Sequence, residues 1–214
     1  MKSDETNEVK SAPVKKQSQV KKRRIGIYAG TFDPVHAGHI AFALQAAKAA
    51  GLSTVYLAPE RHPRRKQQVT HYAHRVAMIR RAIRPFRQLQ VLELEDKTFS
   101  VLHTLPRLEG QFAHTSFVFV CGSDVVKHMS EWPHIGRFFE VFELCIGLRG
   151  DEQSATLDAL LSELPAQPRG RIYVRSHASA VASSQVREAL RENRGVRGLL
   201  ASVREYAARE WLYL

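Results

Sequence analysis

The sequence predicts an α/β protein with a mostly parallel sheet and helices on both of its faces. Runs of β-branched and aromatic residues alternate with helical patterns after residue 24, which is typical of a sheet built from βαβ units. The chain has 214 residues, of which 44% are apolar, and can therefore bury one sizeable core. We expect a single domain over residues 24–214.

The first half of the chain supplies three expected strands and three expected helices. In chain order they are strand 23–30, helix 37–51, strand 53–59, helix 70–83, strand 89–95 and helix 98–108. Gly51 is typical of a helix end, and Pro59 stops the second strand. Thr70 is expected to cap the second helix, and Pro106 to interrupt the third.

The second half begins with the most hydrophobic run of the chain. The expected elements are strand 115–122, a strand within 138–149, helix 155–164, strand 171–176, helix 183–193 and helix 201–214. Cys121 and Cys145 lie in the two apolar strand runs, where free cysteine behaves as a small hydrophobe. Two such cysteines favour a reducing cytoplasm over a disulfide framework, so we expect a cytoplasmic protein.

The formal net charge is +11, and residues 1–24 hold eight of the basic and three of the acidic side chains. Residues 1–23 have almost no large apolar side chains and are expected to form a disordered basic tail. Its basic cluster at 21–24 could contact nucleic acid, but a solvating tail is favoured. The remaining positive charge predicts an acidic or phosphorylated ligand. No apolar run approaches membrane-spanning length, so no membrane partner is expected.

Two histidines flank Gly38 directly after the glycine turn of the first strand. Gly30 permits that turn, and His36 and His39 share one side at the start of the following helix. Helix N-terminal amides attract anions, and two imidazoles would donate to the same place. In a parallel sheet the ligand lies beyond the carboxyl ends of the strands, where this segment falls. We therefore expect a phosphate site.

A second cluster opens the helix at 183–193. Ser183 and Ser184 are expected to cap it, with Arg187 one turn in. Hydroxyls, free amides and a guanidinium at one helix start would make another phosphate cradle. Taken alone, the pattern favours an ordinary capped helix with an exposed arginine.

Together, "GTFDPVHAGH" and "SSQVRE" resemble the HxGH and S-x-(S/T)-x-x-R motifs of the nucleotidyltransferase superfamily. The segments "APERHPRRK", "FVFVCGSDVVKHMSEWPHI" and "VRGLLASVREYAAREWLYL" are similar to the nicotinate-nucleotide adenylyltransferase family. The resemblance covers residues 24–214 and implies a Rossmann-like fold of the nucleotidyltransferase type. It also implies transfer of AMP from ATP to a pyridine mononucleotide, first nicotinate mononucleotide, with release of pyrophosphate in NAD biosynthesis.

The resemblance assigns roles to thirteen residues. Those implied to act on the ATP phosphates as catalytic residues are His36, His39 and Arg187. Those implied to bind ATP are Gly30, Thr31, Phe32, Gly38, Ser183 and Ser184. Those implied to bind the acceptor are Val101 through its N–H, Asp124 near the ribose, Trp132 by stacking on the pyridine ring, and Lys66. Mg²⁺ is expected with ATP, and no protein-bound metal is expected.

The chain departs from the family pattern at several positions. Ala29 and Ala182 replace a glycine and a serine, and Pro133 follows Trp132 where the family uses a backbone N–H for the nicotinate carboxylate. Proline has no N–H to donate. The AMP-transfer residues are therefore kept, while recognition of the acceptor is altered.

Other functions remain open at the level of sequence. The chain could be a related nucleotidyltransferase with another phosphate acceptor, or a non-catalytic nucleotide-binding relative. The glycine turn lacks the G-x-G-x-x-G pattern of dehydrogenases, and His71 and His74 lack a third zinc ligand. The chain is short for a class I aminoacyl-tRNA synthetase. The oligomeric state stays open, a homo-oligomer included.

Overall fold

The computed structural model describes residues 22–63, 66, 68–175, 181–192, 194–195 and 197–213. Within these residues all strands join one parallel six-stranded sheet in the order β3-β2-β1-β4-β5-β6. The strands are β1 (Arg23–Gly30), β2 (Thr54–Pro59), β3 (Leu89–Val91), β4 (Thr115–Gly122), β5 (Phe142–Leu148) and β6 (Arg171–Arg175). The predicted parallel sheet is confirmed.

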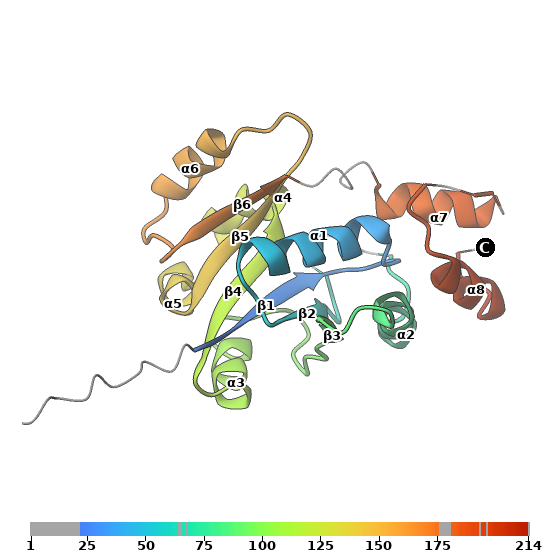
Figure 1. The fold of residues 1–214 in the computed structure, drawn as a ribbon, viewed down its shortest axis with the longest axis horizontal. Helices are drawn as coiled ribbons and strands as arrows, with labels where there is room; N and C mark the ends of the chain where they lie inside the picture. Colours follow the sequence, from blue (N-terminus) through green and yellow to red (C-terminus); the bar gives the residue numbers. More distant parts are fainter. Residues whose placement is uncertain are drawn as a thin grey trace, which may run out of the picture.

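Helices cover both faces of the sheet (Figure 1). On one face lie α1 (Ala37–Ala49), α2 (Tyr72–Ile83) and α8 (Ala201–Arg209). On the other lie α3 (Thr104–Gln111), α4 (Ser123–Val126), α5 (Ile135–Val141) and α6 (Ser154–Ser162). Near the carboxyl end of β1 lies α7 (Ser183–Arg191), beside α8 (Figure 1).

The two apolar cores follow from the alternation of side chains along the strands. Ile25 and Ile27 of β1 enter the core beneath α3 and α5, whereas Val55 and Leu57 of β2 enter the core beneath α1 and α2. Strands buried on both faces have near-continuous apolar runs, which is why β2 and β4 were recognisable in the sequence.

The first structured residue of the sheet lies inside the segment expected to be tail. Arg23 begins β1, and its guanidinium donates to Ser53 Oγ and Thr54 Oγ1, both at 3.0 Å. Arg23 was included both in the expected strand 23–30 and in the expected tail; the strand is confirmed, and these hydroxyls hold the Arg23 side chain. Of the expected tail, residues 1–21 lie outside the described residues.

Several helix boundaries differ from the sequence prediction. His71, and not Thr70, precedes α2, and the Thr70 N–H donates to Asp33 Oδ2 at 3.1 Å. Pro106 does not interrupt a helix: it lies in the first turn of α3, where proline costs no hydrogen bond. The last helix ends at Arg209, before residues 210–213 turn back.

The position of the candidate site follows from the strand order. Connections run outward in opposite directions from β1 and β4, so a crevice opens between the carboxyl ends of these adjacent strands. Gly30 and Gly122 are the last residues of the two strands. No helix in the described part of the chain is long and apolar enough to cross a membrane.

Candidate active site

The two histidines lie against each other at the start of α1. His36 is the residue before the helix and His39 lies in its first turn, with their ring centroids 3.7 Å apart. The His39 ring also meets the edge of Phe32, at a centroid distance of 5.0 Å. Phe32 itself packs over Gly30, where a Cβ would lie 3.2 Å from its ring. The Phe32 ring therefore contacts both Gly30 and the His39 ring.

A backbone hydrogen bond fixes the proton on His39. The His36 N–H donates to His39 Nδ1 at 3.2 Å, so Nδ1 is the acceptor and the neutral ring carries its proton on Nε2. Burial lowers the pKa of His36 to about 4, and burial together with His36 lowers the pKa of His39. Both rings are thus neutral at pH 7, and His39 offers an Nε2–H donor.

The His36 ring is buried, and its Nδ1 has no hydrogen-bond partner among the described residues. A buried polar atom without a partner is uncommon and is typical of a place where a ligand binds. The amides nearby are only partly available, because the Ala37 N–H already donates to Gly198 O at 2.9 Å. Gly38 is buried in the same helical turn.

The late serine–arginine motif lies beside this loop, as expected, but not as a helix cap. Ala182 precedes α7, and Ser183 donates its hydroxyl to Pro34 O at 3.2 Å. Arg187 Nη1 donates to Asp33 O at 2.6 Å, whereas Ser184 is exposed. The cap prediction was wrong because the Ser183 hydroxyl is used to join α7 to the loop before α1.

A pocket of about 550 Å³ opens next to the loop, at the carboxyl ends of β1 and β4. The predicted residues that line it are Gly30, Thr31, Lys66, Val101, Asp124 and Trp132. The histidine pair, Ser183, Ser184 and Arg187 lie outside the lining that the described residues give it. The predicted residues therefore form two groups. The phosphate-side group comprises the histidine pair, Ser183, Ser184 and Arg187, and the pocket group comprises the lining residues, with Gly30 and Thr31 nearest the phosphate side.

Aromatic side chains form one wall of the pocket. Trp132 is half-buried and meets Phe119 and Phe138 edge-on, at centroid distances of 5.9 and 5.3 Å. Pro133 also lines the pocket, as does Val101 from the opposite segment. An indole fixed in this way offers a stacking surface for a planar ring.

Charged side chains at the pocket are unevenly distributed. Lys66 is the only lysine or arginine among the described lining residues, and burial followed by the charge of Arg187 lowers its pKa. Glu60, Asp124 and Glu131 line the same pocket. Lys66 thus lines the pocket and also interacts with the charge of Arg187 in the phosphate-side group.

Arg149 at the end of β5 was not predicted from the sequence. It forms an ion pair with Asp124 at 2.8 Å, and its charge contributes to the lowered pKa of His39. Asp124, expected near a ribose, lines the pocket and is held by this arginine. The position of Arg149 directly after an apolar strand run was the sequence feature from which this residue could have been predicted.

Arg75 was also missed. Its side chain is fully buried, and its guanidinium donates to the carbonyls of Thr31, Thr70 and Arg61 at 2.8, 2.8 and 3.1 Å. It ties the loop after β1 to the segment before α2. Helical spacing was the available signal, since Arg75 falls three residues after Tyr72 on the apolar side of α2.

This arrangement can bind and orient two phosphorylated groups. The phosphate-side group supplies neutral imidazole and guanidinium donors, and no nucleophile–base pair is needed when the substrates provide the nucleophile. An adjoining pocket with a planar aromatic wall can hold a heterocycle.

Comparison with known proteins agrees with the geometry. A cytidylyltransferase-like family model matches residues 27–189. A probable nicotinate-nucleotide adenylyltransferase of Geobacillus kaustophilus is 31% identical over 196 residues, covering 89% of this chain and 86% of the relative. Its counterpart from Bordetella petrii is also 31% identical, covering 89% of this chain and 99% of the relative.

Solved structures show the same fold at lower identity. The nicotinic acid mononucleotide adenylyltransferase of Plasmodium falciparum, complexed with NaAD, has a TM-score of 0.71 at 18% identity, over 89% of this chain and 97% of that one. A nicotinate-nucleotide adenylyltransferase structure from Vibrio parahaemolyticus, described as putative, has a TM-score of 0.62 at 16% identity, over 89% and 95%. With its sheet order, histidine pair and curated relatives, this chain belongs to the nicotinate-nucleotide adenylyltransferase family.

Proposed function

We propose that this protein transfers AMP from ATP to nicotinate mononucleotide and releases pyrophosphate, a step of NAD biosynthesis. The observation that carries the proposal is that the serine–arginine motif of α7 is hydrogen-bonded to the loop that leads into the histidine pair. Ser183 and Arg187 donate to the carbonyls of Pro34 and Asp33, two and three residues before His36. Residues 36–39 and 183–187, which can donate hydrogen bonds to phosphate, thus lie next to the pocket that Trp132 lines.

The transfer needs positioning more than acid–base chemistry. The 5′-phosphate of the acceptor attacks the α-phosphorus in line, and pyrophosphate leaves with the electron pair of the broken P–O bond. His39 donates its Nε2–H to the reacting phosphate, while His36 and Arg187 hold the leaving side together with Ser184. Fixed donors of this kind stabilise charge that spreads over the phosphate oxygens.

Mg²⁺ enters as part of the substrate in this proposal. The described residues contain no cluster of three or more histidine, cysteine, aspartate or glutamate side chains suited to a metal ion. Mg²⁺ is commonly bound through substrate phosphates with few protein ligands, so it accompanies ATP and screens its charge. We place the reaction in the cytoplasm, in keeping with the two buried free cysteines.

Release of pyrophosphate on mixing the protein with MgATP and nicotinate mononucleotide tests the proposal. A matched reaction with nicotinamide mononucleotide measures acceptor choice, and ATP alone is the control. Release with neither mononucleotide, alongside tight binding of ATP, would instead identify the non-catalytic nucleotide-binding relative.

A further inference from the structure

The last described residue of the chain returns to the loop that follows β1. The Tyr213 hydroxyl donates to Asp33 Oδ1 at 2.6 Å, and the Thr70 N–H donates to Asp33 Oδ2 at 3.1 Å. Asp33 is only 3% exposed. Both oxygens of a buried carboxylate are therefore satisfied by segments far away in sequence.

The same loop leads directly into the histidine pair. Asp33 lies three residues before His36, whose N–H fixes His39 through Nδ1. The Asp33 carbonyl is already held by Arg187. Movement of the Asp33 side chain would therefore move the phosphate-side donors, whereas the pocket wall at Trp132 lies on other elements.

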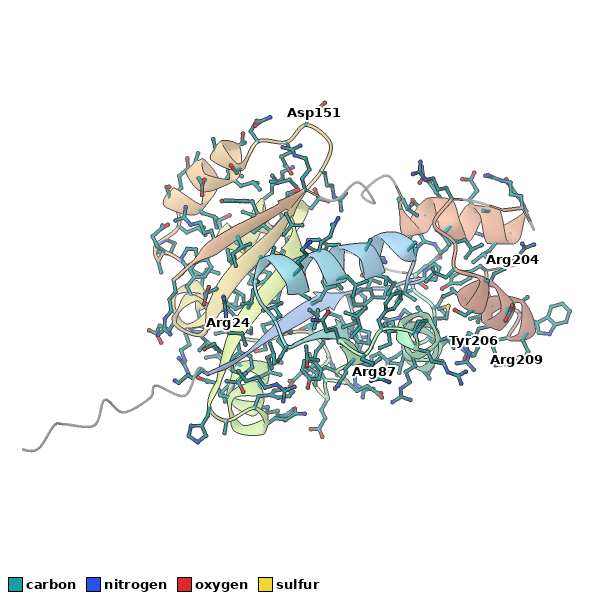
Figure 2. The ribbon with its side chains drawn as sticks, viewed as in Figure 1. Arg24, Arg87, Asp151, Arg204, Tyr206 and Arg209 are labelled. Carbon is teal, nitrogen blue, oxygen red and sulfur yellow. The ribbon has the colours of Figure 1, made fainter. Side chains whose placement is uncertain are left out.

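The C-terminal segment is anchored before it reaches Asp33. On α8, the Tyr206 hydroxyl lies 2.9 Å from His74 Nδ1, and the Arg81 guanidinium lies 4.1 Å from the Tyr206 ring centroid. Figure 2 shows Tyr206 on α8, on the side nearer α2. After Arg209 the chain turns back, and Tyr213 takes a left-handed φ of 66°.

We propose that Tyr213 is a positioning residue: through Asp33 it holds the loop 31–36 in the geometry that places His36 and His39. This role in turnover rests on the proposed function, whereas its effect on the histidines does not. The loss of the phenol would leave Asp33 Oδ1 buried without its donor, and such a group moves toward water or a new partner.

Tyr213→Phe tests the proposal while keeping the ring. At saturating ATP and nicotinate mononucleotide, kcat is expected to fall about tenfold, the scale of one lost charge-assisted hydrogen bond. The KM for the mononucleotide should stay within twofold, because the stacking surface of Trp132 packs on Phe119 and Phe138, outside the loop 31–36. In an Asp33→Ala background Tyr213→Phe should have no further effect. A fall in kcat of less than threefold overturns the proposal.

Tyr206→Phe is the matched control. It removes a phenol from the same C-terminal segment and loosens α8 from α2, but it does not touch Asp33. A lower Tm with kcat within twofold of the wild type is expected. Equal falls in kcat for the two variants would show that only the general stability of the segment matters, and the proposal would be wrong.

A measurement without turnover separates this inference from the function itself. The ring ¹⁵N resonances of His36 and His39 in the nucleotide-free protein should shift in Tyr213→Phe and not in Tyr206→Phe. If the wild type released no pyrophosphate with either mononucleotide, the proposed function would fail, and these resonances would still decide the role of Tyr213. Unchanged histidine resonances in Tyr213→Phe overturn that role.

Discussion

His39 presents a fixed donor because the His36 N–H occupies its other ring nitrogen. Removing the ring in His39→Ala is expected to lower kcat by roughly 10²–10³, the usual effect of losing one charge-stabilising donor. The Tm should change little, since the ring is only half-buried. His74→Ala removes a histidine bonded to Tyr206 away from the loop and serves as control. Wild-type turnover in His39→Ala would refute this placement of the reacting phosphate.

His36 makes stability depend on pH. Burial lowers its pKa to about 4, whereas histidine in an unfolded chain titrates near 6.5. Between these values the unfolded chain binds more protons, so the free energy of unfolding falls as the pH falls. From pH 7 to pH 5 this loss is about 2 kcal/mol for His36.

Urea unfolding without nucleotide at the two pH values measures this loss. His36→Asn should show a shallower pH dependence than the wild type. Some dependence should remain, because the lowered pKa of His39 acts in the same direction. Identical pH dependence in both proteins would contradict the assignment.

Pro133 lines the pocket without an N–H to donate. A missing charge-assisted hydrogen bond costs about 1.5–3 kcal/mol, which is roughly ten- to a hundred-fold in preference. We expect kcat/KM to favour nicotinate over nicotinamide mononucleotide only weakly, and Pro133→Tyr to strengthen that preference. A preference of several thousand-fold in the wild type, unchanged by the substitution, would show that the carboxylate is recognised elsewhere.

At the level of elements, α7 and the loop before α1 form one unit. Arg187→Ala removes the guanidinium that bonds to Asp33 O, together with its remaining N–H donors. We expect a KM for ATP at least tenfold higher, as for other lost charge-assisted contacts. Arg191→Ala, an exposed position one turn along the same helix, should leave that KM unchanged. Similar values for both variants would remove Arg187 from the ATP site.

The elements also show how far sequence reasoning reaches. Strands β1, β2 and β4 were predictable because apolar runs ending in glycine or proline have few alternatives. The short α4 could not be predicted, since four residues carry no helical period. The site divides in the same way. His36, His39 and Arg187 follow from motif spacing, whereas Arg149 and Tyr213 act through contacts between distant segments.

For the whole molecule, the described six-stranded sheet begins at Arg23. Arg23 already pairs with Thr115 of β4 and bonds to Ser53 and Thr54. Deleting residues 1–21 should therefore leave the Tm within about 2 °C and turnover nearly unchanged, as for surface changes that remove no core contact. Differential scanning calorimetry and the pyrophosphate assay measure the two. A large loss of either would show that the N-terminal segment is needed for the fold or for turnover.

Among the described residues, the hydrogen bonds of the buried Arg75 guanidinium go to main-chain carbonyls, those of Thr31, Arg61 and Thr70. Every amino acid supplies a carbonyl, so a change of side chain at any of these three positions leaves the acceptor of the Arg75 hydrogen bond in place. The reverse is not true, because lysine lacks the planar fork that reaches three acceptors at once. Of the four residues in this contact, Arg75 is therefore the one whose side chain cannot be exchanged, because the other three contribute main-chain atoms.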